Sequence, residues 1–289
     1  MIPGAFAYAC PHSVGEAVGM LAECGEGAKI LAGGQSLLPL LRLRSMAPKL
    51  LVDINRVPQL RGVREEGDSL VIGSMTTQHD LLHDALVQRN APLLAAAAQM
   101  AGDPAVRHRG TLGGSVTHAD PAGDLAPVVL ALDGELVAQG PRGLRTIPAA
   151  AFFVGHLATA LEPEELLVEI RLPKAGEGWG FHYEKFQVSA QAPTLVGVAA
   201  AVRCENGGIA EVRIALANMG VTPLRAATTE AALTGADATE AAVARAAEGV
   251  AEGTTPTTPE PGHSTVYRAH LARVLTRRAV LAAVRTERS

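Results

Sequence analysis

Two glycine-rich loops carry the residues whose types and spacing are best suited to binding a cofactor. The first is Ala32-Gly33-Gly34-Gln35-Ser36, and the second is Thr111-Leu112-Gly113-Gly114-Ser115. Glycine has no Cβ, so a ligand can approach the backbone closely and the loop can turn with its N–H groups exposed. The flanking Gln, Ser and Thr side chains add donors for phosphate or ribose oxygens. Together the loops predict a diphosphate-containing cofactor, whereas a single loop of this kind is more often only a tight turn.

The carboxylate of Asp124 follows the second loop closely enough to share its site. It lies ten residues after Gly114 and can accept hydrogen bonds from ribose hydroxyls. Neither loop has the spacing Gly-x-Gly-x-x-Gly of the dinucleotide fold or Gly-x-x-x-x-Gly-Lys of the phosphate loop. The sequence therefore argues against both of these nucleotide-binding motifs.

Two histidine motifs are weaker candidates, for a metal site. His79-x-x-x-His83 places two imidazoles on one helical face, but an Asp follows each His, and we interpret this face as a solvated helix start. His118-x-Asp120 directly follows the second loop without an apparent third ligand, so we interpret His118 as part of the wall of the cofactor pocket. The three cysteines form no Cys-x-x-Cys pair, and the chain has no Gly-x-Ser-x-Gly motif. We therefore expect neither a metal or iron–sulfur cluster nor a protein nucleophile in this chain.

The composition excludes several classes of function. A net charge of −4 provides no footprint for nucleic acid or anionic lipid, and an aromatic content of 3% argues against an aromatic-lined groove. The start of the chain has no signal-peptide pattern, and no apolar run approaches the roughly 20 residues of a membrane span. We expect a cytoplasmic protein that does not bind nucleic acid.

Short strands and helices must position the two loops. Ser13 caps a predicted helix, and a buried strand at Lys29–Ala32 leads into the first loop. The apolar runs Leu125–Leu132 and Glu135–Ala138 flank a turn dipeptide and predict a β-hairpin. Asn206-Gly207 predicts a second hairpin, because both residue types tolerate positive φ.

These elements predict an α+β fold in three lobes. Residues 1–56 form an N-terminal α/β lobe, residues 57–176 a second lobe, and residues 177–289 a C-terminal lobe of hairpins and helices. The Gly-rich, charged stretch Lys174–Gly180 marks the last boundary.

The chain resembles the FAD-binding medium subunits of the molybdenum hydroxylases, the family of aerobic carbon monoxide dehydrogenase and xanthine dehydrogenase. The matching stretches cover nearly the whole chain: Phe6–Ala17, Leu31–Leu41 (LAGGQSLLPLL), Val106–Pro127 (VRHRGTLGGSVTHADPAGDLAP), Phe181–Phe186 (FHYEKF), Gly220–Arg225 (GVTPLR) and Tyr267–Leu271. Subunits of the carbon monoxide dehydrogenase type are the most similar. The resemblance implies a two-lobed FAD-binding domain of the vanillyl-alcohol-oxidase (PCMH) type, followed by a C-terminal lobe of antiparallel strands and helices.

The resemblance also implies how FAD is bound. The two loops, Ala32–Ser36 and Thr111–Ser115, would hold its pyrophosphate and ribityl region, and Asp124 would contact its sugar or diphosphate end. Lys185 would lie near the isoalloxazine, where a cation stabilises the anionic reduced ring. Leu167 would pack on the flavin. No residue of the chain is expected to act as a catalytic acid or base.

By the same resemblance, the chain is an electron-transfer subunit of a heteromeric oxidoreductase. A large subunit with molybdopterin would oxidise the substrate, and a small subunit with [2Fe–2S] clusters would pass the electrons to FAD. FAD would deliver them to a quinone, NAD or oxygen. The implied assembly is a dimer of heterotrimers, and peripheral association of the complex with a membrane is compatible with it.

One stretch departs from the family pattern. After Lys185 the family often has an Arg-rich segment, then Gly-Asp and an aromatic residue, but Gln187–Thr194 contains no aromatic, and His108 stands where Asn is common. The electron acceptor and the substrate therefore stay open, and the complex could hydroxylate an N-heterocycle, a purine or an aldehyde instead of oxidising CO. A stand-alone FAD oxidase, and a non-enzymatic scaffold whose loops are only turns, are the remaining alternatives.

Overall fold

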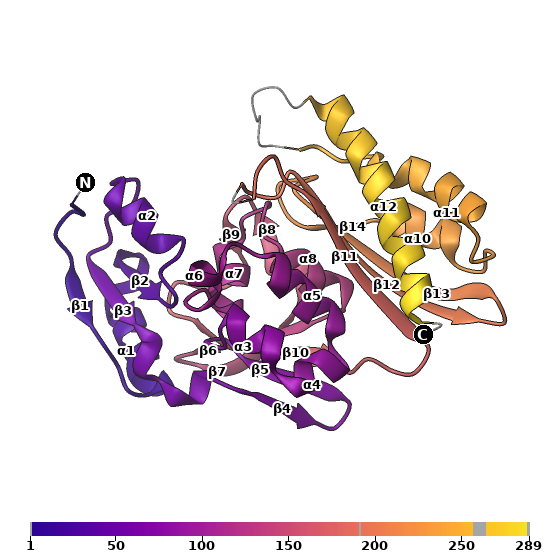
Figure 1. The fold of residues 1–289 in the computed structure, drawn as a ribbon. Helices are drawn as coiled ribbons and strands as arrows, with labels where there is room; N and C mark the ends of the chain where they lie inside the picture. The colour runs from indigo at the N-terminus through magenta and orange to yellow at the C-terminus, as the bar shows by residue number, and fades with distance from the viewer. Residues whose placement is uncertain (1, 191, 257–263, 288–289) are drawn as a thin grey trace.

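The computed structural model describes residues 2–190, 192–256 and 264–287, which form three regions along the chain (Figure 1). The N-terminal region contains a parallel sheet of order β1-β3-β2. Its elements are β1 (Ala7–Ala9), α1 (Val14–Cys24), β2 (Ala28–Leu31), α2 (Leu37–Arg42) and β3 (Leu50–Asp53).

The predicted helix after Ser13 is confirmed as α1. The Ser13 hydroxyl accepts a hydrogen bond from the Glu16 N–H, and the Glu16 carboxylate accepts one from the His12 N–H, so one amide in the first turn and one just before the helix have partners. The buried face of α1 packs against the sheet through Ala17, Val18 and Leu21. The strand predicted at Lys29–Ala32 lies one residue earlier, as β2. The first glycine loop therefore begins at Ala32.

The second region is a five-stranded antiparallel sheet of order β4-β5-β10-β6-β7, with helices packed against it. Its strands are β4 (Val63–Glu66), β5 (Ser69–Gly73), β6 (Glu135–Gly140), β7 (Gly143–Pro148), β8 (Phe153–Gly155), β9 (Ala158–Thr159) and β10 (Leu166–Pro173), of which β8 and β9 form a separate pair. Its helices are α3 (Gln78–His83), α4 (Ala85–Asn90), α5 (Pro92–Met100), α6 (Pro104–Arg107), α7 (Leu112–His118), α8 (Leu125–Ala131) and α9 (Ala149–Phe152).

The hairpin predicted around Asp133-Gly134 is wrong. Leu125–Ala131 is the helix α8, in which every residue is buried, and Glu135 begins strand β6 after a helix-to-strand turn. A short segment that is buried on all sides is apolar at every position. Its sequence therefore lacks the hydrophobic periodicity that would distinguish a helix from a strand. The strand β6 instead pairs with β7, and its hairpin turns between Gly140 and Gly143.

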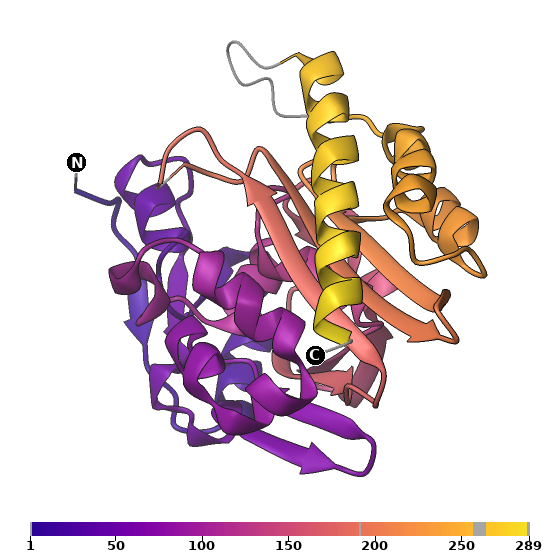
Figure 2. The ribbon, with the colours of Figure 1, turned by 45° about the vertical axis from the view of Figure 1, so that its right-hand side comes forward.

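The third region is an antiparallel sheet of order β11-β12-β13-β14, covered by helices. Its elements are β11 (Trp179–Phe186), β12 (Val196–Glu205), β13 (Gly208–Ala217), β14 (Leu224–Arg225), α10 (Ala227–Leu233), α11 (Glu240–Ala247) and α12 (Thr265–Glu287). The predicted hairpin at Asn206-Gly207 is confirmed, with φ of 52° and 84° at these residues. Figure 2 shows α12 lying along β11 and β12, with which it makes its main contacts.

The fold agrees with the predicted α+β class and with antiparallel sheets in the C-terminal part. Among the described residues, no helix is both long enough and apolar enough to cross a membrane. The lobe limits at residues 56 and 176 remain predictions.

Candidate functional site

The two glycine loops contact each other through their backbones. A Cβ on Gly33 would lie 2.0 Å from the carbonyl oxygen of Arg109, just before the second loop. A Cβ on Gly114 would lie 3.6 Å from the Cβ of Ala32. Only a residue without a side chain permits the first of these approaches. The structure therefore unites two loops that the sequence separates by more than seventy residues.

The first loop presents backbone donors. Among the residues that the structure describes, the N–H groups of Gly33, Gly34, Gln35 and Ser36 donate to no protein acceptor. Gly34 has a φ of 76°, a conformation that disfavours side chains, and the side-chain amide of Asn55 donates to the Ala32 carbonyl oxygen at 2.9 Å. Successive amides held in this way form a concave surface that suits an anion.

The second loop has its amides largely satisfied within the fold. The Thr111 hydroxyl caps α7 by accepting from the Gly114 N–H at 3.1 Å, and the Gly113 N–H donates to the Ser74 carbonyl oxygen at 2.8 Å. A Cβ on Gly113 would lie 2.6 Å from that oxygen. This loop thus contributes a closely packed surface together with the half-buried Ser115, rather than a row of vacant amides.

Asp124 and Lys185 lie together in an ion pair. The Lys185 Nζ donates to Asp124 Oδ2 at 3.0 Å and to the Met100 carbonyl oxygen at 2.6 Å. The hydroxyls of Tyr183 and Thr194 both donate to Asp124 Oδ1, each at 2.7 Å. The side chains of Lys185 and Asp124 are 3% and 10% exposed, so this charge is buried but paired.

The buried network also affects Tyr183. Burial, and then the negative charge of Asp124, raise the pKa of the Tyr183 phenol well above its usual value. The phenol therefore remains a neutral hydrogen-bond donor to the carboxylate at physiological pH. Asp124 precedes α8 directly but does not cap it, because its oxygens accept these other hydrogen bonds.

Two other predicted site residues lie near α7. His118 ends α7 and is half-buried, and Ala119 after it has a φ of 51°. Leu167 is 3% exposed and belongs to the central core, on strand β10, against which α7 packs. Roles for both residues toward a cofactor remain predictions.

A cluster of three imidazoles, with rings tilted against one another, adjoins the second loop. The ring of His79 lies 4.3 Å from that of His83 and 3.9 Å from that of His108, between ring centroids. Desolvation, followed by repulsion from His108 and His83, lowers the pKa of His79. No group of three or more His, Cys, Asp or Glu residues within the described part of the chain has an arrangement suited to a metal ion.

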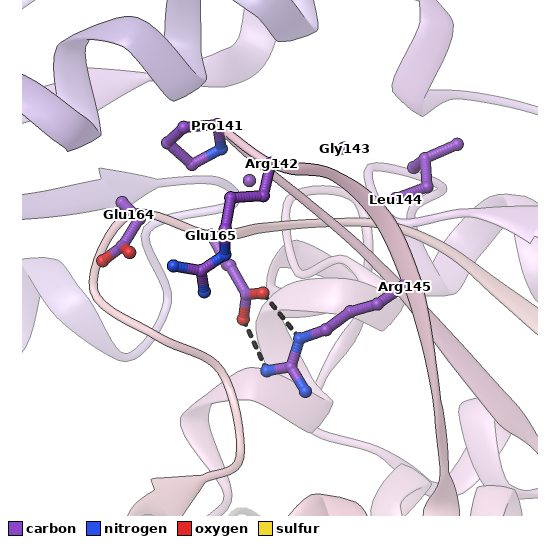
Figure 3. Close-up of a pocket in the computed structure, with 8 residues that line it drawn as sticks. Pro141, Arg142, Gly143, Leu144, Arg145, Glu164 and Glu165 are labelled. Carbon is purple, nitrogen blue, oxygen red and sulfur yellow. Dashed lines mark hydrogen bonds and ion pairs between the residues drawn. The ribbon is translucent and has the colours of Figure 1, made fainter.

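A hollow of about 220 Å³ lies at the β6–β7 hairpin (Figure 3). It is lined by residues 140–145 together with Glu164 and Glu165, and so by none of the predicted cofactor residues. Arg145 donates two hydrogen bonds to the buried Glu165 carboxylate, at 2.6 and 2.7 Å. We interpret this paired group as a structural link between β7 and the segment before β10.

Sequence reasoning missed Tyr183, Thr194 and Asn55. Tyr183 could have been found, because it stands two residues before Lys185 and strand residues with this spacing share a face. Thr194 lies in a loop seventy residues after Asp124, and no local pattern relates them. Gln191, within the stretch that departs from the family pattern, lies outside the described residues.

Comparisons with known proteins agree along the whole chain. Residues 4–175 match the family described as FAD binding domain in molybdopterin dehydrogenase, and residues 181–283 match the CO dehydrogenase flavoprotein C-terminal domain. The carbon monoxide dehydrogenase medium chain of Hydrogenophaga pseudoflava is 45% identical over 86% of each chain. The 6-hydroxypseudooxynicotine dehydrogenase complex subunit alpha of Paenarthrobacter nicotinovorans is 36% identical over 100% of this chain and 97% of its own.

The fold of the chain is also similar to that of a solved relative. A solved structure of the Hydrogenophaga pseudoflava carbon monoxide dehydrogenase, which lacks the Mo-pyranopterin moiety of its molybdenum cofactor, superposes with a TM-score of 0.95. The identity in that superposition is 44%, and 98% of each chain is covered.

Proposed function

The chain belongs to the family of FAD-binding medium subunits of the molybdenum hydroxylases, and we propose that it holds FAD between its two glycine loops for electron transfer in a complex of the carbon monoxide dehydrogenase type. The observation that carries this proposal is the set of four backbone amides at Gly33–Ser36, which donate to no acceptor in the described part of the chain and are held against the second loop. FAD supplies redox chemistry that no side chain of the chain could provide, because it exchanges electrons singly or in pairs.

The residues present fit a flavin dinucleotide. The vacant amides suit the negative charge of a pyrophosphate, and the glycines keep side chains away from the line where the loops meet. The exposed Gln35 and Ser36 and the half-buried Ser115 add hydrogen-bonding groups for phosphate or sugar hydroxyls. The fit is better at the first loop, because the second loop uses its amides within the fold.

We propose distinct roles for the other predicted residues. Lys185 carries a buried positive charge at the boundary between the second and third regions, where it would stabilise negative charge on a bound flavin. Asp124 holds that ammonium and has limited capacity left for the cofactor's sugar or diphosphate end. His118 lines the pocket wall and Leu167 supports the flavin from the core.

The partners follow from the medium-subunit relatives. We propose a molybdopterin-binding large subunit and a small subunit with [2Fe–2S] clusters, assembled as a cytoplasmic dimer of heterotrimers that can associate peripherally with a membrane. The relative from Paenarthrobacter nicotinovorans is named as a subunit of a 6-hydroxypseudooxynicotine dehydrogenase complex, and we propose an N-heterocycle as the first substrate alternative to CO. A purine or aldehyde substrate and a stand-alone FAD oxidase remain weaker alternatives.

The test uses the chain expressed alone and with its subunits. The purified chain should carry one FAD, measured from its flavin absorbance after release and chromatography. A folded chain without flavin, both alone and in the complex, would overturn the proposal. Bleaching of the flavin absorbance by CO, compared with bleaching by a panel of N-heterocycles, decides between the substrate classes.

A further inference from the structure

The carboxylate of Asp124 joins two parts of the chain. It lies at the start of α8 in the second region, whereas its three side-chain donors, Tyr183, Lys185 and Thr194, belong to β11 and the loop that follows it. These donors come 59 to 70 residues after Asp124. Among the described residues, every side-chain hydrogen bond to this buried carboxylate therefore comes from the beginning of the C-terminal region.

The hydrogen bonds are divided unequally between the two carboxylate oxygens. Oδ1 accepts from the hydroxyls of Tyr183 and Thr194, each at 2.7 Å, which occupies both of its lone-pair directions. Oδ2 accepts from Lys185 Nζ at 3.0 Å. Because Oδ1 is saturated, the carboxylate is fixed in rotation, and only Oδ2 remains to bind the ammonium.

The ammonium is fixed in turn. Of the three N–H bonds of Lys185, one points to Asp124 Oδ2 and a second to the carbonyl oxygen of Met100 at 2.6 Å. Within the described residues, the third has no protein acceptor. Since two acceptors set the orientation of a group that is 3% exposed, the direction of this third donor is determined by the network.

We propose that Thr194 and Tyr183 are positioning residues, which orient Asp124 so that the remaining N–H of Lys185 is directed at the flavin. This inference rests on the proposed function, because it requires FAD to bind beside Lys185. Thr194 makes this contribution from the loop that follows β11. Its backbone is anchored independently, since the Asn218 side-chain amide donates to the Thr194 carbonyl oxygen at 2.8 Å.

The experiment compares Thr194→Val, which removes the hydroxyl at nearly constant volume, with Thr194→Ser, which retains it. Tyr183→Phe is a second test of the same oxygen, and Lys185→Met removes the charge itself. All variants are made in the full FAD-loaded chain, and the two-electron midpoint potential is measured by spectroelectrochemistry together with thermal unfolding. Thr194→Val should shift the equilibrium about tenfold toward the oxidised flavin, which is about 30 mV for a two-electron couple. Thr194→Ser should restore the wild-type potential.

The coupling to Lys185 provides the decisive control. In the Lys185→Met background, Thr194→Val should produce no further shift, because the group that it positions is gone. If Lys185→Met shifts the potential but Thr194→Val and Tyr183→Phe do not, the inference is overturned and the proposed function stands. The same holds if these two variants only lower the unfolding temperature. If Lys185→Met leaves the potential unchanged, or if the wild-type chain binds no FAD, the proposed placement of the flavin fails and the inference fails with it.

Discussion

Substituting Gly33 with Ala should separate the two glycine loops and weaken FAD binding. A Cβ at this position would lie 2.0 Å from the backbone oxygen of Arg109 and 2.8 Å from its carbonyl carbon. A carbon and a carbonyl oxygen ordinarily approach no closer than about 3.3 Å. The contact is therefore about 1.3 Å too short, and both partners are backbone atoms, so no side-chain rotation can relieve it.

The size of the effect follows from this geometry. Forcing one extra methyl group into a packed contact costs about 1–3 kcal/mol. Where that cost is borne by the arrangement of the loops that binds FAD, affinity should fall by about 5- to 150-fold. The dissociation constant is measured from the change in flavin fluorescence when FAD is added to the stripped chain, and thermal unfolding of the stripped chain reports any general loss of stability.

A matched control is available in α1. Gly19 is exposed, and a Cβ placed on it would have no atom within 4 Å, so Gly19→Ala should leave FAD affinity unchanged and should slightly stabilise the helix. Gly33→Ala with an affinity within twofold of wild type would refute the view that the contact between the loops builds the site.

Three further predictions test the surrounding structure. Asp124→Asn should lower the free energy of unfolding by about 3–5 kcal/mol, because it leaves the buried Lys185 ammonium without a compensating charge. Urea denaturation measures the free energy of unfolding, and a loss below about 1 kcal/mol would contradict the prediction. Thr111→Val removes the cap of α7 and should lower the free energy of unfolding by about 1 kcal/mol, which corresponds to a fall of about 2–4 °C in Tm. Thr111→Ser keeps the hydroxyl and should leave the Tm unchanged, and calorimetry measures both values. His108→Asn should raise the pKa of His79 in an NMR titration, since desolvation and its histidine neighbours lower that pKa in the wild type. The folded-state pKa of His79 lies below the ordinary 6.5, so its contribution to stability is present above pH 6.5 and is lost as the pH falls through the folded-state pKa. The variant should lose less of this stability at low pH. An unchanged His79 titration would show that the contact between the rings has no electrostatic consequence.

Local chemistry in the sequence was sufficient to predict several elements. The helix cap at Ser13 and the positive φ values at Asn206 and Gly207 involve only residues within three positions of one another along the chain. Short sequence motifs are therefore enough to predict them. The apolar run Leu125–Leu132 was predicted wrongly because burial on every side erases the periodicity that separates helix from strand.

The candidate site was predictable only in parts. Each glycine loop could be identified from its own residues, but their contact at Gly33 and Arg109 depends on how two regions of the fold pack together. In the same way, Asp124 and Lys185 were predicted as separate cofactor contacts, whereas the structure joins them in one buried network. Thr194 completes that network from a loop whose sequence gave no indication of it.

The network around Asp124 also orders events during biosynthesis. When Asp124 leaves the ribosome, none of its three side-chain donors has been synthesised, since they follow 59 to 70 residues later. Until then, water must solvate the carboxylate. The carboxylate gains its side-chain donors only when β11 and the loop after it dock. With the flavin placed beside Lys185 as proposed, its binding in the native electrostatic environment is accordingly a late step, coupled to completion of the C-terminal sheet.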